Sequence, residues 1–247
     1  MGFDLTRIAR LTPAYKIVSN VADVMSPPKP AKAPTGPLEP GDILVKMNDA
    51  TGLNFLITYG QVFTANGDHA LWTHAGLATS STMIAEMNGE GLQHHNLTGS
   101  NAGYTYAVFR CNYRQVALGA DEANSVLLGL GRGKVVYSKS GAVSSLLPSL
   151  IDSSKKGRLK KALDDIDNKK SLELFCSEHV VFCYLVALEE EKNLPMVNKG
   201  PEFRHMRMQE FFDKEPWQYS PGYLYSMLLS NKLFSYMGRT RGAKWIG

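Results

Sequence analysis

The segment 175–183, with the sequence FCSEHVVFC, brings two cysteines, a glutamate and a histidine close together in the chain. Cys176 stands just before a run in which apolar residues recur every three or four positions, so we expect it at the start of a helix. The helix dipole and the free N–H groups at such a position stabilise a thiolate and lower its pKa, and they can also hold an oxyanion. Cys176 is therefore a candidate nucleophile, and a buried, inert thiol is the alternative.

Two further cysteines, Cys111 and Cys183, are expected to fill the core. Cys183 lies two helical turns after Cys176, where no N–H groups are free, and Cys111 ends a strand-like run. A metal site formed by Cys176, His179 and Cys183 on one helix face is conceivable, but no second ligand pair of recognisable spacing accompanies it. The sequence therefore predicts neither a metal nor an organic cofactor.

A cysteine nucleophile needs a base within hydrogen-bond reach, and two histidines compete for that role. His179 lies on the same helix face as Cys176. However, helical side chains point back toward the N-terminus, and an i, i+3 pair rarely directs both reactive atoms at one substrate. His74 stands in the strand-like run WTHAGLA, where Gly76 permits close approach. The alternative for His74 is an ordinary core or surface histidine.

Glu86 is the candidate for a third member of the site. If residues 70–79 and 82–88 form a hairpin, Glu86 lies on the strand beside His74 and can orient the imidazole ring. Asn88 and Glu90 follow closely and compete for this role. The remaining histidines stand in polar, loop-like surroundings and are expected at the surface: His69, His94, His95 and His205.

The composition excludes several classes of protein. Of the 247 residues, 44% are hydrophobic and 20% are charged, which is typical of a soluble globular protein. The net charge of +4 is mild, and the basic run 155–161 is followed at once by acidic residues, so no nucleic-acid partner is expected. Three cysteines argue against a disulfide framework. Neither a transmembrane stretch nor an apolar secretory signal is present, which predicts synthesis in the cytoplasm without a Sec signal.

The chain divides into a proline-rich N-terminal arm (1–36) and one folded domain (37–247). Strand-like runs occupy residues 41–47, 70–79, 82–88 and 104–111. Helical patterns follow at 120–131, 157–170 and 172–192, and then in the stretch PWQYSPGYLYSMLLSNKLF after a proline turn. Strands first and helices later predict an α+β domain with an antiparallel sheet.

Five blocks, in this order along the chain, resemble circularly permuted papain-like hydrolases: PGDILV, HAGLATSSTMIAEMNGEGLQ, YAVFR, FCSEHVVFCYLVA and YSPGYLY. These hydrolases form the permuted branch of the NlpC/P60 superfamily, which includes the lecithin:retinol acyltransferase-like proteins. The run CSEHVV is similar to the C-S-E-L-V run of bacterial members. It is also similar to the N-C-E-H-F run of the acyltransferases, in which Ser177 would be an insertion. The N-terminal arm has no counterpart in this branch.

The resemblance implies a papain-like fold, in which an antiparallel sheet packs on helices and the nucleophile stands at a helix N-terminus. It implies Cys176 as the nucleophile, His74 as its base and Glu86 as the residue that orients the base, with His179 in a supporting role. The long stretch between YAVFR and Cys176 departs from the pattern and indicates an inserted element.

The function that follows is a Cys-His-(Glu) hydrolase that needs no cofactor. The first hypothesis for its substrate is an amide bond in peptidoglycan stem peptides. Without a secretory signal, such an enzyme would require another route, such as a contact-dependent secretion system that injects a toxin into neighbouring bacteria. Its partners would then include a delivery or immunity protein.

The second hypothesis is a lipid acyl hydrolase or acyltransferase. The apolar C-terminal stretch 223–234 could line an acyl groove or contact a bilayer surface, although a helix that packs into the core explains the same pattern. A third hypothesis is a binding module that has lost catalysis, and an unreactive Cys176 would favour it.

Overall fold

A computed structural model defines residues 36–47, 71–131, 133–144, 170–193 and 208–246. The described elements, in chain order, are β1 (Ile43–Met47), β2 (Trp72–Ala78), β3 (Met83–Asn88), β4 (Gly91–Asn96), β5 (Thr105–Cys111), α4 (Arg114–Gly129), β6 (Val135–Tyr137), α5 (Lys139–Ser144), β7 (Leu172–Leu174), α7 (Cys176–Asn193), α8 (Met208–Phe211), the 3-10 helix η4 (Pro216–Gln218), α9 (Pro221–Ser230), β8 (Phe234–Arg241) and β9 (Lys244–Ile246). The predictions for the arm up to residue 35, the basic run 155–161, the helix 157–170, His69 and His205 lie outside these residues.

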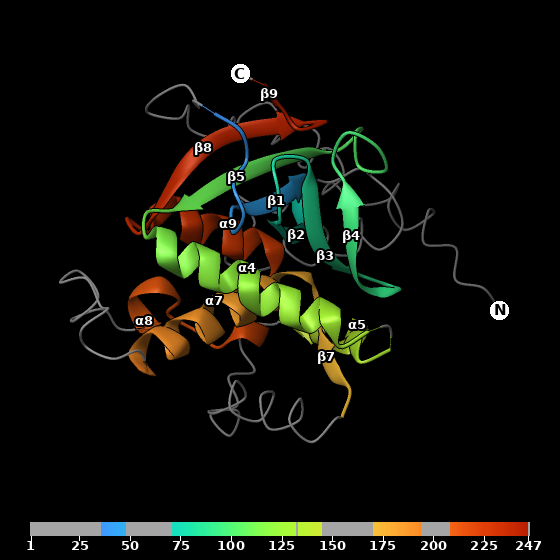
Figure 1. The fold of residues 1–247 in the computed structure, drawn as a ribbon, viewed down its shortest axis with the longest axis vertical. Helices are drawn as coiled ribbons and strands as arrows, with labels where there is room; N and C mark the ends of the chain where they lie inside the picture. The colour runs from blue at the N-terminus through green and yellow to red at the C-terminus, as the bar shows by residue number, and fades with distance from the viewer. Residues whose placement is uncertain (1–35, 48–70, 132, 145–169, 194–207, 247) are drawn as a thin grey trace, which may run out of the picture.

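Seven strands form one antiparallel sheet in the order β4-β3-β2-β1-β5-β8-β9, and β6 and β7 form a separate parallel pair. Figure 1 shows α4 and α7 lying against each other below the sheet. The domain is therefore a mixed α/β structure with a mostly antiparallel sheet packed on helices, as predicted for an α+β protein. None of the described helices is long and apolar enough to cross a membrane.

The sheet has an apolar layer on each face because side chains alternate along a strand. Ile43 and Val45 of β1 join the larger cluster, which includes the buried residues of α4, α7 and α9. Leu44, between them, joins a smaller cluster on the other face. The members of that smaller cluster are Leu38, Leu44, Ala78, Ile84, Leu97, Tyr106 and Val108.

The four predicted strands are confirmed as β1, β2, β3 and β5, but the prediction of strands first and helices later is wrong. β8 returns from the C-terminal part of the chain and pairs with β5. Its sequence, FSYMGRTR, is mostly polar and carries few of the residues that mark a strand. The predicted helix 120–131 in fact begins at Arg114, because Val116 and Ala117 already pack into the core.

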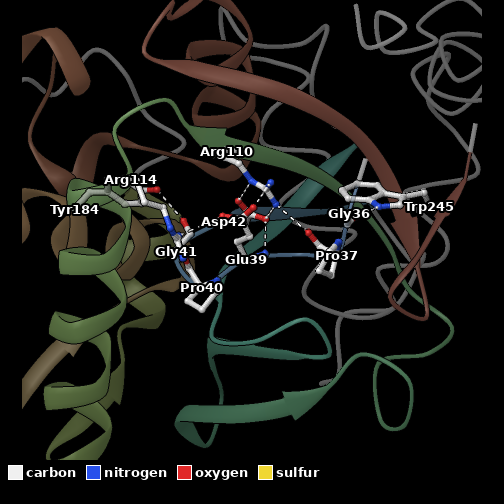
Figure 2. A network of polar contacts seen from close by, with 10 residues as sticks. All are labelled: Gly36, Pro37, Glu39, Pro40, Gly41, Asp42, Arg110, Arg114, Tyr184 and Trp245. Carbon is white, nitrogen blue, oxygen red and sulfur yellow. Dashed lines mark hydrogen bonds and ion pairs between the residues drawn. The ribbon is translucent and has the colours of Figure 1, made fainter. Parts of the chain in front are cut away.

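The turn before β1 is held by a network of polar contacts (Figure 2). Nε and Nη2 of Arg110 donate to the two carboxylate oxygens of Asp42 at 2.8 and 2.7 Å, and Nη1 donates to Glu39 at 2.6 Å. Arg114 donates to the carbonyl of Pro40. Since Asp42 is buried, this bidentate pair satisfies a carboxylate that would otherwise lack partners.

Gly41 brings the same turn against two helices. The hydroxyl of Tyr184 on α7 donates to the Gly41 carbonyl at 2.7 Å. The φ of Gly41 is +86°, and a Cβ at this position would lie 2.3 Å from the carbonyl oxygen of Ala117 on α4. Only glycine combines this backbone conformation with such close packing. At the other end of the described chain, Nε1 of Trp245 donates to the carbonyl of Gly36 at 2.9 Å (Figure 2).

Candidate active site

Cys176 is the first residue of α7, as the sequence predicts. Residues 172–174, which the sequence pattern predicted as part of this helix, instead form the short strand β7, which pairs with β6 and ends two residues before Cys176. The backbone N–H of Phe175 donates to Glu178 Oε2 at 3.4 Å, which is half of a capping box and helps to start the helix at this point. Ser177 donates to the carbonyl of Tyr219 and so ties the start of α7 to the segment that precedes α9. Cys176 is therefore buried and held at the positive end of an 18-residue helix.

His74 reaches Cys176 through an interruption in the sheet. The ladder between β2 and β3 runs from Ala78↔Ile84 to Gly76↔Glu86 and stops there, although β2 extends back to Trp72. The backbone N–H of Ala75 instead makes a hydrogen bond to Cys176, as does the N–H of Ser177, and the His74 ring makes a side-chain hydrogen bond to the same thiol. Cys176 therefore contacts both the backbone of β2 and the His74 side chain.

Glu86 contacts the other side of the His74 ring. Oε2 of Glu86 lies 3.1 Å from His74 Nε2. Oε1 of Glu86 accepts a hydrogen bond of 2.8 Å from Asn101 Nδ2. The residues predicted from the sequence, Cys176, His74 and Glu86, are therefore brought together in one chain of contacts, which Asn101 extends.

Each charged group in this chain of contacts stabilises the charge of its neighbour. Burial lowers the pKa of His74, but the charges of Cys176 and Glu86 and the hydrogen bonds to both outweigh this effect and raise that pKa to about 10. Burial raises the pKa of Cys176, but the His74 charge and hydrogen bond, with the N–H groups of Ala75 and Ser177, bring it below its usual value of 9.0. The arrangement therefore favours a thiolate–imidazolium pair.

Glu86 remains ionised despite its burial. Burial raises its pKa, but the His74 charge, the His74 hydrogen bond and the hydrogen bond from Asn101 reverse this and hold the pKa at about 2. Glu86 is thus a carboxylate at neutral pH, and it can stabilise the protonated form of His74. The competing residues make other contacts, since Asn88 contacts His95 and Glu90 accepts from Gln93.

A polar pocket of about 260 Å³ opens beside this chain of contacts. Its lining consists of Lys46, His74, Glu86, Met87, Asn88, Gly89, His95, Asn101, Tyr104 and Tyr137. Lys46 is the register partner of His74 on β1, and its ammonium lies 3.4 Å from the centre of the Tyr104 ring. Tyr137 lines the pocket together with His74, and burial, followed by the charge of Cys176, raises the pKa of its phenol. A substrate in this pocket would meet mostly polar groups.

His179 is turned away from the thiol. Its Nε2 lies 3.0 Å from Asn124 Oδ1 on α4. Burial, followed by the charge of His74, lowers the pKa of His179 to about 3, so this ring is neutral at physiological pH. Cys111 and Cys183 are buried in the larger core cluster, which confirms their prediction as core residues. Within the described residues, no group of three or more His, Cys, Asp or Glu side chains could hold a metal ion.

The sequence prediction was wrong for His95 and did not identify Asn101, Lys46 or Tyr137. His95 lies in β4, lines the polar pocket and stands 3.9 Å from Glu86. The run GLQHHN lacks the β-branched and aromatic residues of a typical strand, which is why it resembles a loop. Asn101 lies in the polar segment between β4 and β5, where nothing in the residue pattern distinguishes it from a surface turn residue.

The apolar C-terminal stretch is largely occupied by internal packing. Leu224, Tyr225 and Leu228 of α9 are buried, and the ring of Tyr225 stacks on that of Trp72 with centroids 4.4 Å apart. These side chains contribute to the core and are not available to a lipid.

A comparison of the chain with protein-family models, with curated proteins and with solved structures finds no match.

Proposed function

We propose that this protein is a cysteine hydrolase in which Cys176 is the nucleophile and His74 is the general base. Glu86 orients His74 and stabilises its protonated form. The observation that carries this proposal is the continuous contact from the thiol through His74 to Glu86 at the N-terminus of α7. His74 and Glu86 are buried groups with strongly shifted pKa values that line a polar pocket, which is typical of catalytic sites. The arrangement also supports the permuted papain-like fold that the sequence resembles.

The reaction would follow the chemistry of a thiolate–imidazolium pair. The Cys176 thiolate attacks the carbonyl carbon, and N–H groups at the start of α7 can stabilise the resulting oxyanion. The His74 imidazolium then gives its proton to the leaving nitrogen as the C–N bond breaks, which leaves a thioester on Cys176. His74 next takes a proton from water, and the hydroxide attacks the thioester and releases the acid and the thiolate.

The substrate class that we propose is an amide bond in a polar acyl group, such as a peptidoglycan stem peptide. The lining of the polar pocket supports this choice, since Lys46, His95 and Tyr137 offer charge and hydrogen bonds to a peptide. An enzyme with this substrate would need a route to the cell wall. Delivery into neighbouring bacteria as a toxin, with an immunity protein in the producing cell, is the corresponding proposal for its partners and location.

Lipid acyl hydrolysis or acyl transfer is the competing function, and one experiment separates the two. Purified protein is incubated with peptidoglycan fragments and, separately, with mixed phospholipid vesicles, beside a Cys176→Ala control. Mass spectrometry should show new free amines from the peptide fragments with the wild-type protein and none with the variant. Release of fatty acid without peptide cleavage would instead favour the lipid function. No turnover together with an unreactive Cys176 would overturn both.

A further inference from the structure

Asn101 lies behind the catalytic chain of contacts, in the segment between β4 and β5. Its Nδ2 donates to Glu86 Oε1 at 2.8 Å and to the hydroxyl of Tyr106 at 2.8 Å. The two hydrogens of one amide nitrogen are thus directed at two different acceptors. Asn101 and Tyr106 are both buried, with 4% and 1% of their surface exposed, so water does not compete easily for these bonds.

The backbone holds Asn101 as firmly as its side chain. The Asn101 N–H donates to the carbonyl of Asn96 at 3.0 Å, and the Asn101 carbonyl accepts from the N–H of Tyr104 at 3.1 Å. Tyr106 lies in β5 and belongs to the smaller core cluster. The contacts that begin at Cys176 therefore end in a packed strand, and the loop between β4 and β5 is fixed to that strand.

Both oxygens of Glu86 are used, but by groups of different kinds. Oε2 faces the His74 ring, which must exchange a proton during the reaction. Oε1 accepts from Asn101, which does not titrate, and the titratable His95 of β4 lies farther off, with its Nε2 3.9 Å from the same oxygen. A carboxylate held at only one oxygen can rotate about its terminal bond. Glu86 therefore needs the Asn101 contact to keep Oε2 directed at His74.

We propose that Asn101 is a positioning residue that fixes the orientation of Glu86 and, through it, the charge and the angle of the His74 ring. This inference rests on the proposed function. Asn101 does not touch the thiol, so its effect must pass through Glu86. Without it, the imidazolium is less well stabilised, and the thiolate that depends on the imidazolium forms at a higher pH.

The test is the pH dependence of Cys176 alkylation by iodoacetamide, which requires no knowledge of the substrate. Asn101→Ala and Asn101→Leu both remove the donor, and Asn101→Leu keeps a branched side chain of similar size. We expect each to raise the apparent pKa of alkylation by on the order of one pH unit. The matched control is Asn124→Ala, which removes a buried asparagine that contacts His179 and not the catalytic chain.

The outcomes separate this inference from the function on which it rests. An alkylation profile of Asn101→Leu that equals the wild-type profile, while His74→Ala shifts it, would overturn the role of Asn101 and leave the catalytic pair intact. Equal shifts in Asn101→Ala and Asn124→Ala would also overturn it, because they would show a general loss of stability. A wild-type Cys176 that reacts no faster than an ordinary thiol would overturn the proposed function itself.

Discussion

His74 Nε2 and Glu86 Oε2 lie 3.1 Å apart although the two residues are not register partners. Glu86 stands opposite Gly76, two positions along β2 from His74. A Cβ at Gly76 would lie 2.6 Å from the carbonyl oxygen of Ala85, so this glycine lets the two strands come close just before they separate. The contact between His74 and Glu86 therefore forms just beyond the last pair of the β2–β3 ladder.

The first prediction concerns the selectivity of alkylation. Iodoacetamide at neutral pH should label Cys176 much faster than Cys111. The reason is that His74 and two backbone N–H groups lower the pKa of Cys176, whereas burial raises the pKa of Cys111 to about 12. Burial also raises the pKa of Cys183. Peptide mapping by mass spectrometry measures the three rates, and comparable labelling of all three thiols would contradict the assignment.

The second prediction distinguishes the two histidines near the nucleophile. His74→Ala should abolish turnover and slow alkylation of Cys176 at neutral pH, because the thiolate loses its counter-charge and its hydrogen bond. His179→Gln should retain a measurable part of both, because His179 contacts Asn124 on α4. Equal losses in the two variants would show that the base has been assigned to the wrong ring.

The third prediction is a pH dependence of stability that arises from His179. Burial lowers the pKa of this ring from 6.5 to about 3. Between these values the unfolded chain binds a proton that the folded chain does not bind, so the free energy of unfolding falls as the pH drops. From pH 7 to pH 5 this ring should account for a loss of about 2 kcal/mol. Urea unfolding of wild type and His179→Gln at both pH values measures it.

The control for this experiment is His94→Gln, because His94 is exposed. Its loss of stability between the two pH values should match that of the wild-type protein. If His179→Gln also loses as much stability as wild type, the histidine does not titrate in the way that its burial implies.

The elements that the sequence predicted correctly are those whose residue types reflect their own position in the fold. β1, β2, β3 and β5 have apolar, β-branched or aromatic residues because their side chains fill the two core clusters. β4 and β9 lie at the edges, where one side of the strand has no partner strand, and a polar sequence such as GLQHHN suffices. Cys176 and His74 stood out because a helix start and a glycine nearby are visible in the sequence.

Asn101, in contrast, could not be found in this way. It reaches Glu86 across 15 positions of chain through a loop whose path depends on contacts with Asn96 and Tyr104. Tyr137 approaches the nucleophile because β6 and β7 pair in parallel, with Tyr137 opposite Leu174. Both placements come from tertiary packing, and residue types alone do not encode them.

The fourth prediction tests the network around the turn before β1. Arg110→Ala would leave the buried Asp42 carboxylate without its bidentate partner, and we expect a loss of about 3 kcal/mol in the free energy of unfolding. Arg114→Ala is the matched variant, since the Arg114 side chain is 45% exposed. It should lose less than about 1 kcal/mol. Urea unfolding measures both losses. Similar losses in the two variants would show that the burial of Asp42 does not determine how much its arginine partner contributes to the free energy of unfolding.

The fifth prediction compares two glycines with the same backbone geometry. Gly41 and Gly36 have φ values of +86° and +94°, but only Gly41 faces a close neighbour. Gly36→Ala should therefore cost about 1 kcal/mol of stability, from backbone strain alone. Gly41→Ala should cost several times more or prevent folding, because its Cβ would overlap the backbone of α4. A thermal melt of both variants gives the comparison, and equal melting temperatures would contradict it.

The hydrogen bond between Trp245 and Gly36 brings the two ends of the described chain together. In a variant without residues 1–35, a short peptide could therefore join the C-terminal end to Gly36, and the chain could be opened at an exposed turn elsewhere, without moving any strand of the sheet. The fold therefore does not depend on the order of these segments along the chain. Genes that encode these segments in a different order could specify the same constellation of nucleophile, base and carboxylate.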